Sequence, residues 1–274
     1  MVYTLREFGD LKLIYDKHYI HIISIEDCPA HLLEENGRLP CFSIFWFTTD
    51  ACINYIDFES YPIRQGFIYL LAPGQIFSLL GKRPKGYFIF FSGDFFEPGD
   101  EHLRILFNPF INEAVEINKD MASDLEHLFN MMIREKQAAN NYSILHAFVK
   151  LILLQLYRIS PTYTLFPDTK ENRFIKLFDL IEKNYKKQRS TTFYTSQIGL
   201  TPKRLNQILK QKLNITLTQI LHNLLLHEAK REIIFSNKSI KQIAHDLGFN
   251  EQAYFSRFFK KQTGMTPENF RQDR

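Results

Sequence analysis

The chain has 274 residues, of which 45% are hydrophobic and 15% aromatic, and its formal net charge is +4. This length and composition predict two globular domains with packed cores. No apolar run approaches about 18 residues, and the N-terminal segment MVYTLREFGD lacks a hydrophobic stretch, so neither a membrane span nor a secretory signal is expected.

The charge is distributed unevenly along the chain. Residues 173–274 hold 19 Lys or Arg against 8 Asp or Glu, a formal charge of +11, whereas residues 1–172 carry −7. A basic C-terminal third suits binding to phosphates and makes binding of the whole chain to a membrane surface less favourable. The three cysteines, Cys28, Cys41 and Cys52, lack C-x-x-C spacing, so they are predicted to be reduced, buried thiols of a cytoplasmic protein.

Residues 1–100 have the pattern of β-structure. Short segments rich in Ile, Phe and Tyr are separated by Pro, Gly and Asp, with no helical pattern between them. This spacing predicts an antiparallel sandwich or small barrel, and the whole chain is then of the α+β class because its later parts are helical. The predicted strands are Leu11–Tyr15, Tyr19–Ile25, Cys41–Phe47, Ile53–Phe58, Phe67–Leu71 and Tyr87–Phe91.

Histidines are sparse in the β-region. Metal-dependent barrels hold the ion with several histidines and a carboxylate from adjacent strands. Here His18, His21 and His31 come early, and the next histidine is His102. His18 and His21, three residues apart on a predicted strand, point to opposite faces of the sheet, one exposed and one toward the core or a pocket. We therefore predict no metal site, no cofactor and no enzymatic activity.

The interior of a small barrel can still enclose one small molecule. Six aromatic side chains could contact such an effector, although each is more simply explained as a core or surface residue. They are Tyr19, Phe45, Trp46, Tyr55, Tyr69 and Tyr87.

After Pro109 the hydrophobic period becomes helical. Met121–Lys136 and Tyr142–Tyr157 are predicted to be two helices joined by a short turn. Ser160–Lys170 holds two prolines and loses the helical period just before the charge changes, so it is predicted to be a linker. Beyond it, Phe174–Tyr185 is predicted to be an amphipathic helix.

A first helix-turn-helix pattern spans Phe193–Leu213. Gly199 lies at its turn, Thr201 is the expected N-cap of the second helix, and Pro202 takes the first helical position, where a missing N–H does no harm. One stripe of that helix is predicted to be buried, namely Leu205, Ile208, Leu209 and Leu213, and another to be exposed, namely Lys203, Asn206, Gln207 and Lys210.

A second pattern has helices at Ile240–Asp246 and Glu251–Gln262. Gly248 can adopt the positive φ of the turn, Ala244 leaves room where the helices cross, and Asn250 is the expected N-cap. The predicted buried stripe is Phe255, Phe258, Phe259 and Gln262, and the exposed face holds Gln252, Ser256, Arg257 and Lys260.

A helix without Gly or Pro, Leu217–Phe235, is predicted between the two patterns. Its 19 residues make a rod of about 28 Å, comparable to the roughly 34 Å of one turn of B-DNA. Such a rod can hold two reading helices in successive major-groove segments on one face of a duplex.

Asp179–Arg271 resembles the DNA-binding domain of the AraC/XylS family of bacterial transcription regulators. The run IAHDLGFNEQAYFSRFFKKQTGMTPENFR, Ile243–Arg271, is close to the most diagnostic segment of that family. Two positions depart from the usual pattern: Ala253 replaces a serine that could bind phosphate, and Thr195 replaces an alanine at the first helix crossing. More loosely, Asp57–Ser78 with its P-G-Q element resembles the cupin-like sensor domain that often precedes this DNA-binding domain.

The resemblance implies a cytoplasmic transcription activator that binds double-stranded DNA, responds to a small-molecule effector and can contact RNA polymerase. It also implies a cupin-like sensor at 1–120, a dimerising helical pair at 121–159, a linker at 160–172 and a DNA-binding domain at 173–274, with helix-turn-helix units at about 192–213 and 240–263. By resemblance and helical face, the DNA-binding residues are Lys203, Arg204, Asn206, Gln207, Lys210, Asn250, Gln252, Ser256, Arg257 and Lys260.

Two other classes of protein stay open on the sequence alone. One is a structural DNA-binding protein whose barrel only dimerises. The other is an enzyme, either a metallo-cupin or a methyl-accepting repair protein that shares this DNA-binding domain. For the helical pair, the alternatives are a homodimer interface and simple packing on its own barrel, and the candidate interface residues are Ile144, Lys150, Leu151, Ile152 and Gln155.

Overall fold

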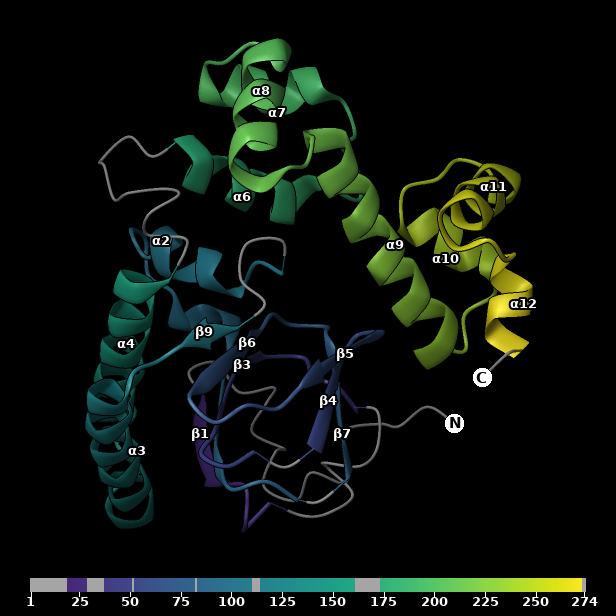
Figure 1. Ribbon diagram of the computed structural model, residues 1–274. Coiled ribbons are helices and arrows are strands. Elements are labelled where there is room, and N and C mark those ends of the chain that lie inside the picture. The colour runs from purple at the N-terminus through teal and green to yellow at the C-terminus, as the bar shows by residue number, and fades with distance from the viewer. Residues whose placement is uncertain are drawn as a thin grey trace. The chain divides into compact units, whose positions relative to one another are not determined.

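The computed structural model describes residues 19–28, 37–50, 52–81, 83–109, 114–160 and 173–272. The chain divides into two compact units, Tyr3–Lys170 and Glu171–Arg274. The first combines β-sheets with helices and the second is helical (Figure 1), so the predicted α+β class is confirmed. The predicted strand Leu11–Tyr15 and all but the first residue of the predicted linker at 160–172 lie outside the described residues.

The described strands of the first unit form two antiparallel sheets. One has the strand order β1-β8-β3-β6-β9 and the other has the order β2-β7-β4-β5. From β1 to β8 the chain alternates between the sheets, except that the hairpin β4-β5 lies within one sheet, as in a jelly roll, an architecture that cupins share. The strands are β1 Ile20–Ser24, β2 Gly37–Arg38, β3 Phe42–Phe47, β4 Cys52–Ile56, β5 Glu59–Pro62, β6 Phe67–Leu71, β7 Ile76–Gly81, β8 Gly86–Phe91 and β9 Val115–Glu116.

Aromatic side chains pack between the two sheets. The alternation of side chains along β3 sends Phe45 inward and Trp46 outward. The ring centroid of Phe45 lies 4.3 Å from those of Phe77 on β7 and Phe88 on β8, so both sheets contribute to this core. On the outer face, the ring of Trp46 lies 5.2 Å from that of Phe129. Because both faces of β3 are covered, all six of its residues are buried.

The predicted helical pair is present. Its helices are α3 Lys119–Ala138 and α4 Tyr142–Ile159, which lie side by side next to β1 (Figure 1). Asn118 and Asn141 cap them by accepting bonds from the third residue after each. Within the described part of the chain, α4 alone is long and apolar enough to cross a membrane, a test that core helices also pass. A short helix, α2 Glu101–Arg104, was not predicted.

Across its described residues, 173–272, the second unit contains seven helices. In Figure 1, α9 runs between one group formed by α6, α7 and α8 and another formed by α10, α11 and α12. The long α9 has the predicted bounds, and so does α10. The helices are α6 Arg173–Asn184, α7 Thr191–Ile198, α8 Pro202–Leu213, α9 Leu217–Phe235, α10 Ile240–Asp246, α11 Gln252–Thr263 and α12 Pro267–Gln272.

Candidate nucleic-acid interface

The first helix-turn-helix unit consists of α7 and α8. Gly199 ends α7 with φ +64, and the hydroxyl of Thr201 accepts a bond from Arg204 N at 3.2 Å, as expected for an N-cap followed by a proline. Tyr194 is fully buried in α7, and burial raises its pKa to about 12. Leu205 and Leu209 are fully buried on α8, so the predicted inward stripe of this helix is correct at its centre.

The outward face of α8 carries cations and amides and no acidic residue. Lys203, Arg204, Gln207 and Lys210 are exposed, with Arg204 Nη1 donating to Gln207 Oε1 at 3.0 Å. Asn206 differs from them because it is half-buried and its Oδ1 accepts a bond from Leu217 N at 3.0 Å. That bond ties α8 to the start of α9, so the structure gives Asn206 a positioning contact in addition to its predicted role.

The second helix-turn-helix unit consists of α10 and α11, with the turn between them at Leu247–Glu251. Ser239 and Gln242 form a capping box at the start of α10. Gly248 has φ +74, and Phe249 N donates to Ala244 O at 2.9 Å, so the predicted tight turn is confirmed. The prediction that Asn250 is the N-cap was wrong. Glu251 has an extended backbone and takes the N-cap position, so α11 begins at Gln252, one residue later than expected.

The outward face of α11 also lacks acidic residues. Gln252, Arg257 and Lys260 are exposed there, Ser256 is half-buried, and Asn250 is exposed in the turn before the helix. Tyr254 is 57% exposed in the first turn and was not a predicted candidate. Its ring centroid lies 5.8 Å from that of Phe249 in the turn.

The inward face of α11 is aromatic. Phe255 and Phe259 are fully buried and Phe258 is half-buried. The predicted inward position of Gln262 was wrong, because this residue is exposed. Phe259 contacts Phe270 of α12 at 5.3 Å, and the last turn of α11, which holds Gln262, extends past that contact.

The connecting helix α9 is held at its ends by caps and along its length by packing. Thr216 and Gln219 form a capping box at its start. Leu225 is fully buried on this helix, whereas the neighbouring Leu224 is half-buried. The burial of two acidic residues on this helix was not predicted. Glu228 and Glu232 are 6% and 9% exposed.

Each of these buried carboxylates has a cationic partner. Glu228 Oε1 lies 2.9 Å from Lys186 Nζ, and its other oxygen lies 3.2 Å from Arg231 Nη1. Glu232 Oε2 lies 3.0 Å from Lys238 Nζ, which also pairs with Asp246 of α10 at 2.8 Å. These two carboxylates are thus engaged inside the C-terminal unit, and the cations of α8 and α11 remain exposed. Glu251 and Glu268 are exposed near α11, where Gln252 Nε2 donates to Glu268 Oε1 at 3.4 Å.

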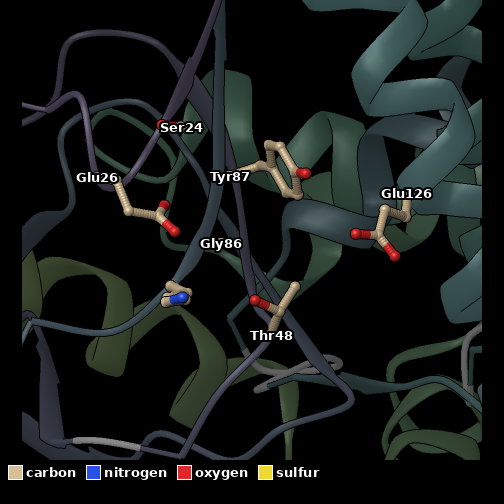
Figure 2. Close-up of a pocket in the computed structure, with 7 residues that line it drawn as sticks. Ser24, Glu26, Thr48, Gly86, Tyr87 and Glu126 are labelled. Atoms are coloured by element: carbon tan, nitrogen blue, oxygen red, sulfur yellow. The ribbon is translucent and has the colours of Figure 1, made fainter.

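A separate pocket lies on the first unit. It has a volume of about 350 Å³ and is lined by Ser24, Glu26, Thr48, Lys85, Gly86, Tyr87 and Glu126. Figure 2 shows Glu26 and Glu126 on opposite sides of Tyr87. Burial, followed by the two carboxylates, raises the pKa of Tyr87. The pocket therefore offers hydroxyl groups, two carboxylates and the cation of Lys85 to a ligand.

Of the aromatic residues considered as effector contacts, only Tyr87 lines this pocket. Tyr19, Phe45, Trp46 and Tyr69 are buried in the packing of the unit, and Tyr55 is half-buried. Tyr69 Oη donates to Pro62 O at 2.9 Å, whereas Tyr19 Oη is buried without a hydrogen-bond partner among the residues that the structure describes. The aromatic contacts among these side chains and their neighbours are mainly those of a core.

His21, Cys28 and Cys41 of the first unit are also buried, as most of those aromatic residues are. His21 is buried, with Lys136 Nζ 3.0 Å from its Nδ1, and His18 lies outside the described residues. Cys28 and Cys41 are buried free thiols whose pKa values burial raises to about 11 and about 12. Among the described residues, no three His, Cys, Asp or Glu side chains gather as a metal site.

Residues 194–273 match the protein family described as a helix-turn-helix domain. The chain is 27% identical over 220 residues to the arabinose operon regulatory protein of Escherichia coli (strain K12), an alignment that covers 78% of this chain and 74% of that protein. It is 31% identical over 115 residues to the bifunctional transcriptional activator/DNA repair enzyme AdaA of Bacillus subtilis (strain 168), covering 42% of this chain and 54% of AdaA. The chain thus spans about half of AdaA and about three quarters of the arabinose regulator.

Solved structures of similar proteins include ToxT from Vibrio cholerae. It is 14% identical, with a TM-score of 0.47, and the match covers 92% of this chain and 97% of ToxT. The C-terminal domain of the response regulator yesN from Fusobacterium nucleatum is 24% identical with a TM-score of 0.35, and covers 36% of this chain and 98% of that domain.

Proposed function

Since its C-terminal domain is a helix-turn-helix domain of the AraC type, we propose that this chain is a DNA-binding transcription regulator that reads its site with α8 and α11 together. The observation that carries the proposal is the repeat of one outward face on two helices at the ends of the 19-residue α9. Two such helices joined by a rod of about 28 Å suit successive major-groove segments. The chain would act in the cytoplasm as an activator, in contact with RNA polymerase and without enzymatic activity.

The exposed side chains divide into two roles. Lys203 and Gln207 of α8, and Gln252, Ser256 and Arg257 of α11, would contact base edges, as their donors and acceptors suit guanine and adenine. Phosphates would be neutralised by the remaining cations, which set affinity and its dependence on salt. Those residues are Arg204, Lys210 and Lys260, and Asn206 and Asn250 would contribute at the edges of the interface.

Arg257→Ala is expected to weaken specific binding by about 1 to 3 kcal/mol and to relax the preference at one base position. The guanidinium is exposed on the outward face of α11, where it can bond the edge of a guanine. The measurement is fluorescence anisotropy on a fragment selected from the source genome and on its single-base variants. Arg173→Ala, which removes an exposed arginine from the start of α6, is the control. A wild-type base preference in Arg257→Ala would refute the assignment.

The first unit would bind a small-molecule effector. The pocket at Tyr87 supports this, because its hydroxyl and carboxylate groups and Lys85 suit a polar ligand. A ligand that binds only the folded chain raises the melting temperature by mass action. A thermal-shift screen of sugars, amines, aromatic acids and cell extract is therefore expected to give at least one positive shift, and no shift from any source would favour a purely structural first unit.

The helical pair would form a homodimer through α4. Ile144, Ala147, Leu151 and Leu154 are exposed at intervals of three and four residues, the spacing of an apolar helix seam. Two predicted interface residues are engaged internally instead. Ile152 is fully buried, and Lys150 Nζ lies 3.0 Å from Asp100 Oδ2. Sedimentation equilibrium of the intact chain tests this, and a monomer at all concentrations would contradict it.

A further inference from the structure

The segment between α6 and α7 is fixed to two parts of the C-terminal unit. Lys186 Nζ lies 2.9 Å from Glu228 Oε1 on α9. Two residues later, Gln188 O accepts a bond of 2.7 Å from Tyr194 Oη, whose side chain is fully buried in α7. The segment is thus anchored on the connecting helix and on the first helix-turn-helix unit at the same time.

Arg189 carries this segment across to the second helix-turn-helix unit. Its Nη2 donates to Leu247 O at 2.6 Å, and its Cζ lies 3.9 Å from the ring centroid of Phe249. A guanidinium this close to an aromatic face makes a cation–π contact. Phe249 in turn packs against Phe255 and Phe258 of α11, with ring centroids 5.2 and 5.4 Å away. Arg189 therefore holds the turn from which the second reading helix starts.

The backbone makes a contact at the same place. A Cβ added to Gly248 would lie 2.0 Å from Lys186 O. The turn of the second helix-turn-helix unit therefore packs directly against the segment between α6 and α7. Arg189 is half-buried here, and burial lowers its pKa while nearby Tyr254 opposes that change. An arginine side chain stays protonated in proteins, so the cation persists at neutral pH.

We propose that Arg189 is a positioning residue that fixes the distance and angle between the two reading helices. The inference rests on the proposed function, because only a protein that reads DNA with both helices needs this spacing. The helix α9 joins the two helix-turn-helix units through a short connection at each of its ends. Asn206 bonds Leu217 N at one end, and Ala229 and Ile233 share a core with α10 and α11 at the other, so only small rotations remain to change the spacing. A direct contact that bypasses α9 removes this freedom, so the free protein is pre-organised for one separation of its two DNA segments.

The DNA test uses a set of fragments that differ only in spacing. The native fragment is the one selected by the wild-type chain, and one or two base pairs are inserted or deleted between its protected segments. Arg189→Ala is expected to bind the native fragment about tenfold more weakly than wild type, a change of about 1.4 kcal/mol. It is also expected to discriminate less than wild type between native and altered spacing.

Two further variants separate positioning from charge. Arg189→Lys keeps the cation but loses the planar guanidinium, so it is expected to share part of the loss of spacing discrimination. Lys187→Ala removes an exposed cation two residues away and is expected to keep the wild-type discrimination. If Arg189→Ala keeps the wild-type ratio of affinities between native and altered spacing, Arg189 supplies only charge or stability and the proposal is wrong.

A second measurement needs no DNA and so separates this proposal from the proposed function. Spin labels at Gln211→Cys on α8 and Gln262→Cys on α11, both exposed positions, report the distance between the reading helices in the intact chain with Cys52→Ser. Cys28 and Cys41 are buried and would not be labelled. The distance distribution is expected to be narrow with Arg189 and broad in Arg189→Ala. Equally narrow distributions would overturn the positioning role whether or not the chain binds DNA.

Discussion

Gly248→Ala is expected to destabilise the C-terminal unit by about 2 to 4 kcal/mol and to reduce DNA binding with it. Gly248 has φ +74, a conformation that costs an L-residue about 1 to 2 kcal/mol. The added Cβ would also lie 2.0 Å from Lys186 O. Because that oxygen belongs to the backbone, it cannot turn aside as a flexible side chain would, and the turn or the segment must shift. Denaturant unfolding and DNA titration of the same variant measure the two effects.

Gly264→Ala is the matched control. Gly264 ends α11 with φ +83, and a Cβ there would meet no atom within 4 Å. This variant is expected to lose only the conformational cost of about 1 to 2 kcal/mol. Equal losses in the two variants would show that the close approach of Gly248 to Lys186 has no energetic weight, which would contradict the packing described here.

Phe255→Ala is expected to cost about 3 to 5 kcal/mol of stability, a large part of the 5 to 15 kcal/mol that a domain typically has. The side chain is fully buried, and its ring lies 5.2 Å from that of Phe249 and 6.0 Å from that of Phe259. Removing it leaves a cavity where α10 and α11 meet, since close-packed neighbours relax only in part. Calorimetry of the intact chain should show an early transition of the C-terminal unit.

The adjacent residue provides the control for this substitution. Tyr254 is 57% exposed, so Tyr254→Ala should change the stability by no more than about 0.5 kcal/mol, as surface substitutions usually do. Its effect should instead appear in DNA binding, because the exposed ring lies in the first turn of α11, 5.8 Å from the ring of Phe249. A large loss of stability in Tyr254→Ala, or a small one in Phe255→Ala, would mean that the two faces of α11 have been exchanged.

The helical unit was largely predictable because its signals are local. Capping residues, glycine at turns and apolar residues at helical spacing all act within a few residues of one another. They gave α9 and α10 their correct bounds and placed Thr201 as the cap of α8. Where local signals compete, prediction was less secure. Asn250 is a good N-cap by type, yet the chain stays extended for one more residue.

The sheets were less predictable because pairing depends on residues far apart in the chain. The strands β2 and β9 have two residues each and owe their existence to β7 and β6, respectively. The strand β7, which was not predicted, follows a Pro-Gly turn and pairs with β4, more than twenty residues earlier in the chain. The contact of Arg189 with Leu247 joins residues 58 apart, and no local pattern marks either partner. Such contacts need the fold before they can be inferred.

Hydroxyl-radical footprinting of the intact chain on a fragment selected from the source genome tests the central claim most directly. Two reading helices on one rigid α9 predict two protected segments on a single face of the duplex, about 10 base pairs apart. One isolated protected segment, or protection with no sequence preference, would contradict the conclusion that α8 and α11 read DNA together.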